Sequence, residues 1–316
     1  MLPNFYFSTY KFALELREEI STGFFLGSTL RGAFGKVLRN ICCIGEKETC
    51  THCPLAPKCA YQYIFSPIWL EEYGILSKNQ NIVRGFVIKP PLSDIKTHRL
   101  SFQMVLMGRL NKWLPYIIVP FKELGKLGLG YHRIPFSLSK ISIFDLKRDT
   151  WESIYSEKDD LVRPKEIAVT WTDLVKSLKG KNEVTLKFLT PTSLKYNPSG
   201  QKGKSIQAKS PEFHILIKRL RDRINALLNF YCHDRLDIDF KKFGKDAEDV
   251  VKVNDKTMWF KRERKRKNGK FHDLSGFMGE VTFRGNLAQF LPYLALGQYI
   301  HVGENTAFGN GWFKIM

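Results

Sequence analysis

The sequence lacks the long apolar runs that a membrane-spanning helix requires. Its apolar stretches fall well short of the about 20 residues that cross a bilayer, and the opening residues MLPNFYFSTYKF lack the apolar centre of a signal peptide. Cysteine is scarce outside one short segment, because five of the six cysteines lie between residues 42 and 59. This clustering differs from the spaced pairs of a secreted disulfide framework. We therefore expect a cytoplasmic protein that has no membrane partner.

Acidic residues are also in short supply. The 316 residues include 50 Lys and Arg against 31 Asp and Glu, which gives a net charge of +19 at pH 7. A positive field of this size attracts polyanions and speeds their encounter with the protein. Nucleic acid is therefore the leading candidate partner, ahead of an anionic membrane surface.

The two halves of the sequence show the same order of predicted elements. In residues 1–148, apolar spacing predicts strands and helices in the order βαββαβ, at 10–17, 28–41, 82–90, 99–107, 110–124 and 136–144. In residues 181–316 the same order recurs at 183–190, 211–231, 256–263, 276–284, 286–298 and a terminal strand. This order is the ferredoxin-like arrangement. Residues 149–180 are charged and weakly periodic, which predicts a linker with a short helix.

An internal repeat supports this division. The segment LNKWLPYI at 110–117 parallels LAQFLPYL at 287–294. Each segment is followed by a Gly-x-Gly before an amphipathic strand, with Gly128 and Gly130 in one half and Gly309 and Gly311 in the other. The sequence therefore predicts an α+β protein of two tandem ferredoxin-like (RRM-like) domains.

The clustered cysteines form a knuckle, CCIGEKETCTHCPLAPKC, inserted in the first domain. Cys50 and Cys53 have the spacing of zinc ligands, with Cys43 or Cys42 upstream and Cys59 downstream. Four thiolates close a tetrahedral structural site, so we expect a structural zinc ion. The alternative is a set of reduced thiols that bind no metal.

A dense basic run, KRERKRK at 261–267, lies at the predicted tip of a hairpin. Such a tip repels itself unless a polyanion neutralises it, and RNA stems are contacted through shape and phosphates. The alternative is a solvated loop, and we expect Trp259 and Phe260 to belong to the sheet core rather than to stack on bases. We assign the RNA backbone contacts to Arg262, Arg264, Lys265, Arg266 and Lys267.

A glycine-rich loop, HVGENTAFGNG, precedes the terminal strand. Gly303, Gly309 and Gly311 let the backbone turn and approach a ligand, and successive N–H groups in such a loop can form an anion-binding nest. We therefore predict that these glycines contact RNA.

Several of these motifs together resemble a known family. They are LRGAFGKVLRNICC, CTHCPLAPKCAYQYIFSP, GLGYHR, the basic run and GFMGEVTFRGNLAQFLPYLALGQYIHVGENTAFGNG. In this order they resemble the CRISPR-associated RAMP endoribonucleases that process precursor CRISPR RNA. The resemblance implies binding of CRISPR repeat RNA and metal-independent cleavage, with no catalytic cofactor. The products would be a 5′-hydroxyl and a 2′,3′-cyclic phosphate.

The implied chemistry defines the catalytic candidates. The RNA 2′-hydroxyl is the nucleophile, so the protein must supply a base, an acid and cations for the developing charge. Relatives often place a histidine in or just after the first helix, but residues 28–42 contain none. The candidates are therefore His52 and His301, with Arg31 and Lys36 as a cationic alternative. His132 lies in the corresponding loop of the first half, and Arg39 shares a helix face with Arg31, which favours RNA binding.

Two other functions fit the same features. A non-catalytic RAMP subunit would hold guide RNA among other CRISPR effector subunits. A zinc-containing protein outside CRISPR systems would bind RNA or DNA without preferring a repeat.

Overall fold

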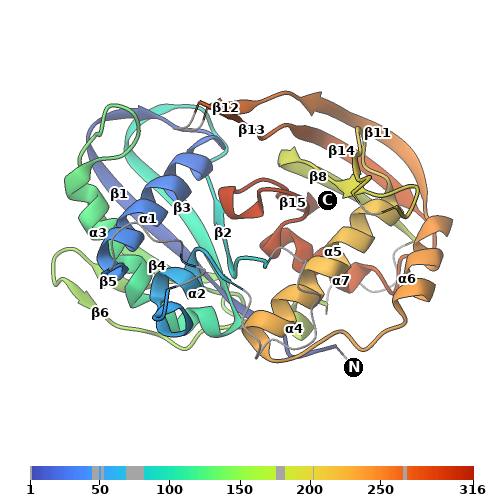
Figure 1. Ribbon diagram of the computed structural model, residues 1–316, viewed down its shortest axis with the longest axis horizontal. Coiled ribbons are helices and arrows are strands. Elements are labelled where there is room, and N and C mark those ends of the chain that lie inside the picture. The colour runs from blue at the N-terminus through green and yellow to red at the C-terminus, as the bar shows by residue number, and fades with distance from the viewer. Residues whose placement is uncertain are drawn as a thin grey trace. The chain divides into compact units, whose positions relative to one another are not determined.

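The computed structural model describes residues 2–44, 50, 53–68, 82–175, 182–201, 203–265 and 269–316 (Figure 1). These residues form two compact units. The first comprises Asn4–Thr170 and Ala226–Arg235, and the second comprises Trp171–Asn225 and Leu236–Met316, with residues 2–3. Across the described ranges, every helix is too short or too polar to cross a membrane.

The first unit is built on an antiparallel sheet. Its long strand β1 (Tyr6–Ser21) pairs with β3 (Lys96–Met107) on one side and with β4 (Phe136–Asp145) on the other, while β2 (Phe86–Lys89) pairs with β3. The order β2-β3-β1-β4 is that of a ferredoxin-like fold, as the strand spacing predicts. The helices between these strands are α1 (Leu26–Cys42) and α3 (Pro115–Leu127).

Four phenylalanines join these two helices to the sheet. Phe34 of α1 stacks on Phe121 of α3 with ring centroids 5.3 Å apart, and Phe121 lies 5.1 Å from Phe12 of β1. Phe12 in turn stacks on Phe102 of β3 at 5.1 Å. All four side chains are buried, so the apolar faces expected from the sequence form one core.

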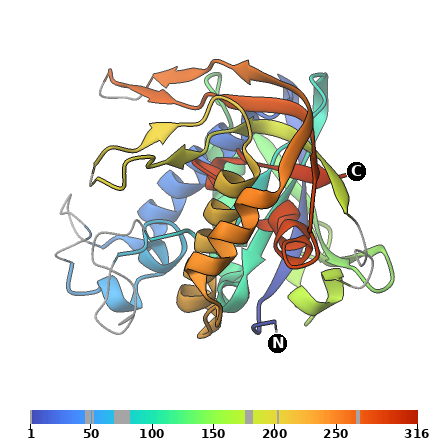
Figure 2. The same cartoon turned by 90° about the vertical axis from the view of Figure 1, so that its right-hand side faces the viewer.

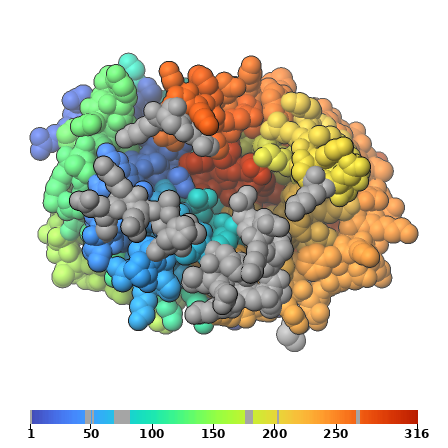
Figure 3. Space-filling model, in the orientation of Figure 1, coloured from blue at the N-terminus to red at the C-terminus, as the bar shows by residue number. Residues whose placement is uncertain are grey.

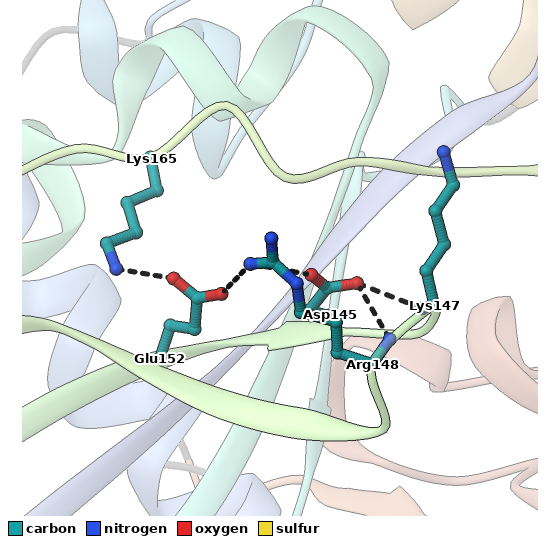
Figure 4. Close-up of polar contacts among 5 residues, drawn as sticks. All are labelled: Asp145, Lys147, Arg148, Glu152 and Lys165. Carbon is teal, nitrogen blue, oxygen red and sulfur yellow. Dashed lines mark hydrogen bonds and ion pairs between the residues drawn. The ribbon is translucent and has the colours of Figure 1, made fainter.

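The sheet continues into the segment that the sequence predicts as a linker. Strand β5 (Thr150–Ser156) pairs with β4, β6 (Leu161–Val162) pairs with β5, and β7 (Val169–Thr170) pairs with β1, before helix α4 (Trp171–Val175). Charged side chains on and between these strands pair with one another, which hides the apolar alternation (Figure 4). Glu152 accepts hydrogen bonds from Arg148 at 3.0 Å and from Lys165.

A segment from later in the chain completes the first unit. Helix α5 (Phe213–Leu227) runs on into a π-helical turn η5 (Leu228–Cys232), which carries Tyr231. The Tyr231 hydroxyl donates to the carbonyl of Val83 at 3.1 Å, and its ring meets Tyr63 edge-on at 5.8 Å. Gly85 admits this ring, because a Cβ at that position would lie 2.6 Å from it.

The second unit repeats the arrangement. Strand β8 (Glu183–Thr192) lies between β14 (Gly276–Arg284) and β15 (Phe313–Ile315), and β11 (Val251–Phe260) pairs with β14. The order β11-β14-β8-β15 is again ferredoxin-like, with α5 and α7 (Leu291–Ile300) as the two helices of the repeat. The structure therefore confirms two ferredoxin-like domains. Both copies of the repeated segment lie where the second helix of a domain begins, at α3 and α7.

The remaining elements are short. Beyond β11 and β14, the chain forms a two-stranded hairpin (Figure 2). The other short elements are η2 (Ala56–Lys58), α2 (Ala60–Ile64), η4 (Gly108–Trp113), β9 (Lys195–Tyr196), β10 (Ile206–Gln207), α6 (Phe240–Asp246), η6 (Ala247–Asp249), β12 (Glu263–Lys265), β13 (Phe271–Asp273) and η7 (Thr306–Phe308).

Candidate functional site

A hollow of about 700 Å³ lies between α1 and α2 in the first unit. Three of the predicted catalytic and RNA-binding residues line it, namely Arg31, Lys36 and Arg39 of α1, so the helix brings these cations together. The blue surface of α1 and the lighter blue surface of residues 53–68 adjoin in Figure 3. The other lining residues are Gly32, Gly35, Asn40, Cys43, Tyr61 and Phe65. We call this site the cationic hollow.

Aromatic rings hold the cations of the hollow in place. The guanidinium carbon of Arg31 lies 3.9 Å from the ring centroid of Phe65, and that of Arg39 lies 6.0 Å from Tyr61. A guanidinium that packs its face on a ring keeps a fixed fork of N–H donors, the geometry that suits a phosphate. Gly35 makes this contact feasible, because a Cβ there would lie 1.9 Å from the Phe65 ring.

Tyr61 and Arg84 belong to the same surroundings. Burial raises the pKa of Tyr61, although Arg39, Arg31 and Arg84 act to lower it, so its hydroxyl stays protonated. Burial lowers the pKa of Arg84, whose Nε donates to the carbonyl of Phe65 at 2.8 Å. No sequence motif predicted a role for Tyr61 or Phe65. The spacing of YQYIF, with Tyr61 and Phe65 four residues apart on a short helix, is the signal that could have identified them.

The cysteine knuckle adjoins this hollow. Cys43 lines it, and the N–H of Cys53 donates to the carbonyl of Cys50 at 3.3 Å. Burial and the nearby Cys59 thiol raise the pKa of Cys42. Within the described ranges, which omit 45–49 and 51–52, no three Cys, His, Asp or Glu side chains converge as metal ligands. The zinc site stays a prediction, and the candidate base His52 lies outside the described residues.

His301 is fully buried in the second unit, with an exposed fraction of 0%. Its ring stacks on Trp312 at 5.8 Å, and its Nδ1 lies 3.2 Å from the carbonyl oxygen of Asn310. Its backbone, with φ 62° and ψ 170°, occupies a region that non-glycine residues rarely adopt. This burial favours a structural role, because a bound RNA could reach the ring only if the loop opened.

The glycine-rich loop is closely packed against its own unit. The N–H of Gly309 donates to Thr306 at 2.9 Å and that of Gly311 to Pro191 at 3.1 Å, so neither N–H is available to a phosphate. A Cβ at Gly303 would lie 2.3 Å from the carbonyl oxygen of Ser193, and one at Gly311 would lie 1.8 Å from that of Val302. These glycines therefore allow close backbone packing, and RNA contact by them stays a prediction.

Residues 263–265 of the basic run form strand β12, which pairs with β13 as the predicted hairpin requires. Arg264 and Lys265 are exposed, whereas Arg262 is partly buried, which lowers its pKa. Arg266 and Lys267 lie outside the described residues.

Two hydrogen bonds join the hairpin to the glycine-rich loop. His272 Nε2 lies 2.9 Å from Asn305 Oδ1, and Asn305 Nδ2 donates to the carbonyl of Asp273 at 3.3 Å. At the base of the hairpin, Trp259 is half-buried under the Lys209 ammonium, which lies 4.4 Å from its ring. The loop therefore braces the base of the cationic tip.

Comparison with known proteins extends these observations. Residues 4–167 match a family model described as an N-terminal domain, and residues 186–313 match the model of the CRISPR-associated endoribonuclease Cas6. An uncharacterized protein of Archaeoglobus fulgidus is 25% identical over 307 residues, which cover 92% of this chain and 91% of that protein.

Two solved structures share the fold over the whole chain. Thermus thermophilus Cas6 matches with a TM-score of 0.54 at 14% identity, over 99% of this chain and 99% of that one. A Cas6 product complex matches with a TM-score of 0.59 at 14% identity, over 98% and 99%. The motifs, the two ferredoxin-like domains and the matching model agree: the chain shares the fold of the Cas6 structures, and its residues 186–313 match the Cas6 family of CRISPR-associated endoribonucleases.

Proposed function

We propose that this protein binds CRISPR repeat RNA and cleaves it without a metal ion, by attack of the RNA's own 2′-hydroxyl. The match of residues 186–313 to the Cas6 endoribonuclease model supports the reaction class. The observation that carries the proposal is the cationic hollow, where Arg31, Lys36 and Arg39 converge beside Tyr61 and Phe65.

The reaction needs no external reactant. The 2′-oxygen forms a bond to phosphorus as the bond from phosphorus to the 5′-oxygen breaks, which leaves a 2′,3′-cyclic phosphate and a 5′-hydroxyl. One proton leaves the 2′-oxygen and one reaches the 5′-oxygen. Arg31 and Lys36 stabilise the charge that builds on the non-bridging oxygens between these steps.

The proton transfers need a base and an acid. His52 remains the proposed base, because a neutral imidazole accepts a proton near neutral pH. The Tyr61 hydroxyl, which its raised pKa keeps protonated, supplies an O–H donor within the hollow. We assign it to the leaving 5′-oxygen.

The hairpin supplies a second cationic surface. Arg262, Arg264 and Lys265, with Arg266 and Lys267 beyond them, bind the RNA backbone in this proposal. Phosphate contacts of this kind release counterions, so affinity should fall steeply as salt rises. The hairpin therefore contributes affinity, and the cationic hollow contributes the chemistry.

Incubation of the protein with repeat RNA in EDTA tests the proposal. The RNA should carry the repeat of the genome that encodes the protein, and cleavage at one position with a cyclic phosphate end is expected. Tight binding of intact RNA would instead support the non-catalytic RAMP subunit.

A substitution in the hollow sharpens this test. Arg31→Ala should lower the single-turnover rate by about 10²–10³-fold, the usual effect of removing one donor to a developing oxyanion. Arg17→Ala is the matched control, because Arg17 is exposed on β1 of the same unit and its removal changes the charge equally. Equal rates for the two variants would exclude Arg31 from the chemistry.

A further inference from the structure

Gln62, on α2, has a buried amide with no hydrogen-bond partner among the described residues. Its exposed fraction is 3%, and neither Nε2 nor Oε1 has a hydrogen-bond partner in the described part of the chain. Buried amides are nearly always hydrogen-bonded, because an unpaired donor or acceptor away from water is unfavourable. Such a group calls for a ligand that the structure does not contain.

Gln62 belongs to the lining of a hollow that is separate from the cationic one. Gln62 lines it with Ala56, Pro57, Tyr63, Pro67 and Phe230, all within the first unit. It has about 30 Å³ of room, enough for a water molecule or two. A narrow hollow of this kind excludes bulky groups and suits the edge of a flat ring.

The aromatic walls of this hollow are held rigidly. Tyr63 stacks on Trp113 with ring centroids 5.2 Å apart and an angle of 29°. It also meets the edge of Tyr231, whose hydroxyl is bonded to the carbonyl of Val83. The hollow is therefore preformed, and the Gln62 amide is the group in its lining that has hydrogen-bonding capacity to spare for a polar edge.

Helix α2 lies between the two hollows. Tyr61 and Phe65 line the cationic hollow, whereas Gln62 and Tyr63 line this one. The helix has five residues, about 7 Å of length at 1.5 Å per residue. An RNA strand whose phosphate lies in the cationic hollow can therefore place a nearby base in the hollow beside Gln62.

We propose that Gln62 is a specificity-determining residue that reads the edge of an unpaired base of the bound RNA. A carboxamide presents a donor beside an acceptor, and glutamine pairs in this bidentate way with adenine. Proteins read RNA sequence mainly at unpaired bases, which they stack on aromatic residues and bond along their edges. The inference rests on the proposed function, because it takes the RNA to be bound in the neighbouring cationic hollow.

The test compares binding of short oligoadenylate, oligocytidylate and oligouridylate to the full chain. The wild type should prefer one of them, with oligoadenylate expected, by about tenfold or more. Gln62→Met keeps the length of the side chain and removes the amide. It should abolish this preference and raise the thermal midpoint, because an unpaired buried amide is lost.

Control variants keep this test decisive. Gln289→Met changes an exposed glutamine in the second unit and should bind like the wild type. Gln62→Leu repeats the measurement if the methionine variant does not fold. An unchanged base preference in the Gln62 variants, or none in the wild type, would overturn the inference and leave water as the occupant. Failure of the wild type to cleave repeat RNA would instead count against the proposed function alone.

Discussion

Gly35→Ala perturbs the cationic hollow without removing any group that could touch RNA. Gly35 lies inside α1, where glycine is about 1 kcal/mol less favourable than alanine, so the substitution would ordinarily stabilise the helix. Here a Cβ would lie 1.9, 2.2 and 2.5 Å from three atoms of the Phe65 ring. The ring must therefore move.

The Phe65 ring has little room to move. It is 7% exposed and stacks on Tyr61 at 5.4 Å and on Phe86 at 6.4 Å. Overpacking of a core typically costs about 1–3 kcal/mol, which exceeds the gain in helix propensity. We expect a net destabilisation of about 1–2 kcal/mol.

Movement of the ring also moves Arg31, whose guanidinium packs on it at 3.9 Å. A displacement of about 1 Å in a positioned group can lower a rate by about 10²-fold. The single-turnover cleavage rate of Gly35→Ala should therefore fall at least tenfold, whereas RNA binding through the hairpin should change little. Thermal melting and single-turnover kinetics on the same preparation measure the two effects.

Gly244→Ala is the matched control. Gly244 lies in helix α6, and a Cβ there would meet only the flexible end of Lys218, at 2.8 Å. This variant should be as stable as the wild type or slightly more stable, with an unchanged rate. If Gly35→Ala melts and cleaves like Gly244→Ala, the assignment of the chemistry to the cationic hollow is wrong.

Two further outcomes follow from the site. His301→Ala should lower the melting temperature, because it leaves a cavity at a buried position beside Trp312. The cleavage rate measured on the folded variant should change less than tenfold. A hundredfold loss of rate would instead support His301 as the base. Metal analysis should find about one zinc ion per chain, and Cys50→Ser should lower both zinc content and melting temperature, because metal binding is coupled to folding. A zinc content near zero in the wild type would remove the metal site.

Much of the fold could be predicted from the sequence, because each domain buries one regular face. The alternating apolar residues of β1 and the parallel segments at 110–117 and 287–294 were sufficient to predict two βαββαβ units. The sequence did not predict strands β5–β7, because charged residues interrupt the apolar alternation there. Glu152 pairs at the surface with Arg148 and Lys165.

The site was predictable only in part. The spacing of Arg31, Lys36 and Arg39 along one helix is local information, so their common surface followed from the sequence. The position of Tyr61 and Phe65 beside the arginines of α1 depends on Gly35 and on tertiary packing. The spacing of apolar residues along a helix does not predict such packing. The sequence also did not reveal that the N–H groups of Gly309 and Gly311 donate to the carbonyls of Thr306 and Pro191, and RNA contact by these glycines stays a prediction.

The late segment that carries Tyr231 affects how the chain matures on the ribosome. Residues 171–225, which are 55 residues, must be synthesised after Thr170 before the segment Ala226–Arg235 can close the first unit. At about 5–20 residues per second, this interval lasts roughly 3–11 s. Strand β15 can pair with β8 only after residues 313–315 have been synthesised. The first unit can therefore close while the second is still being synthesised, and the second is completed later by β15.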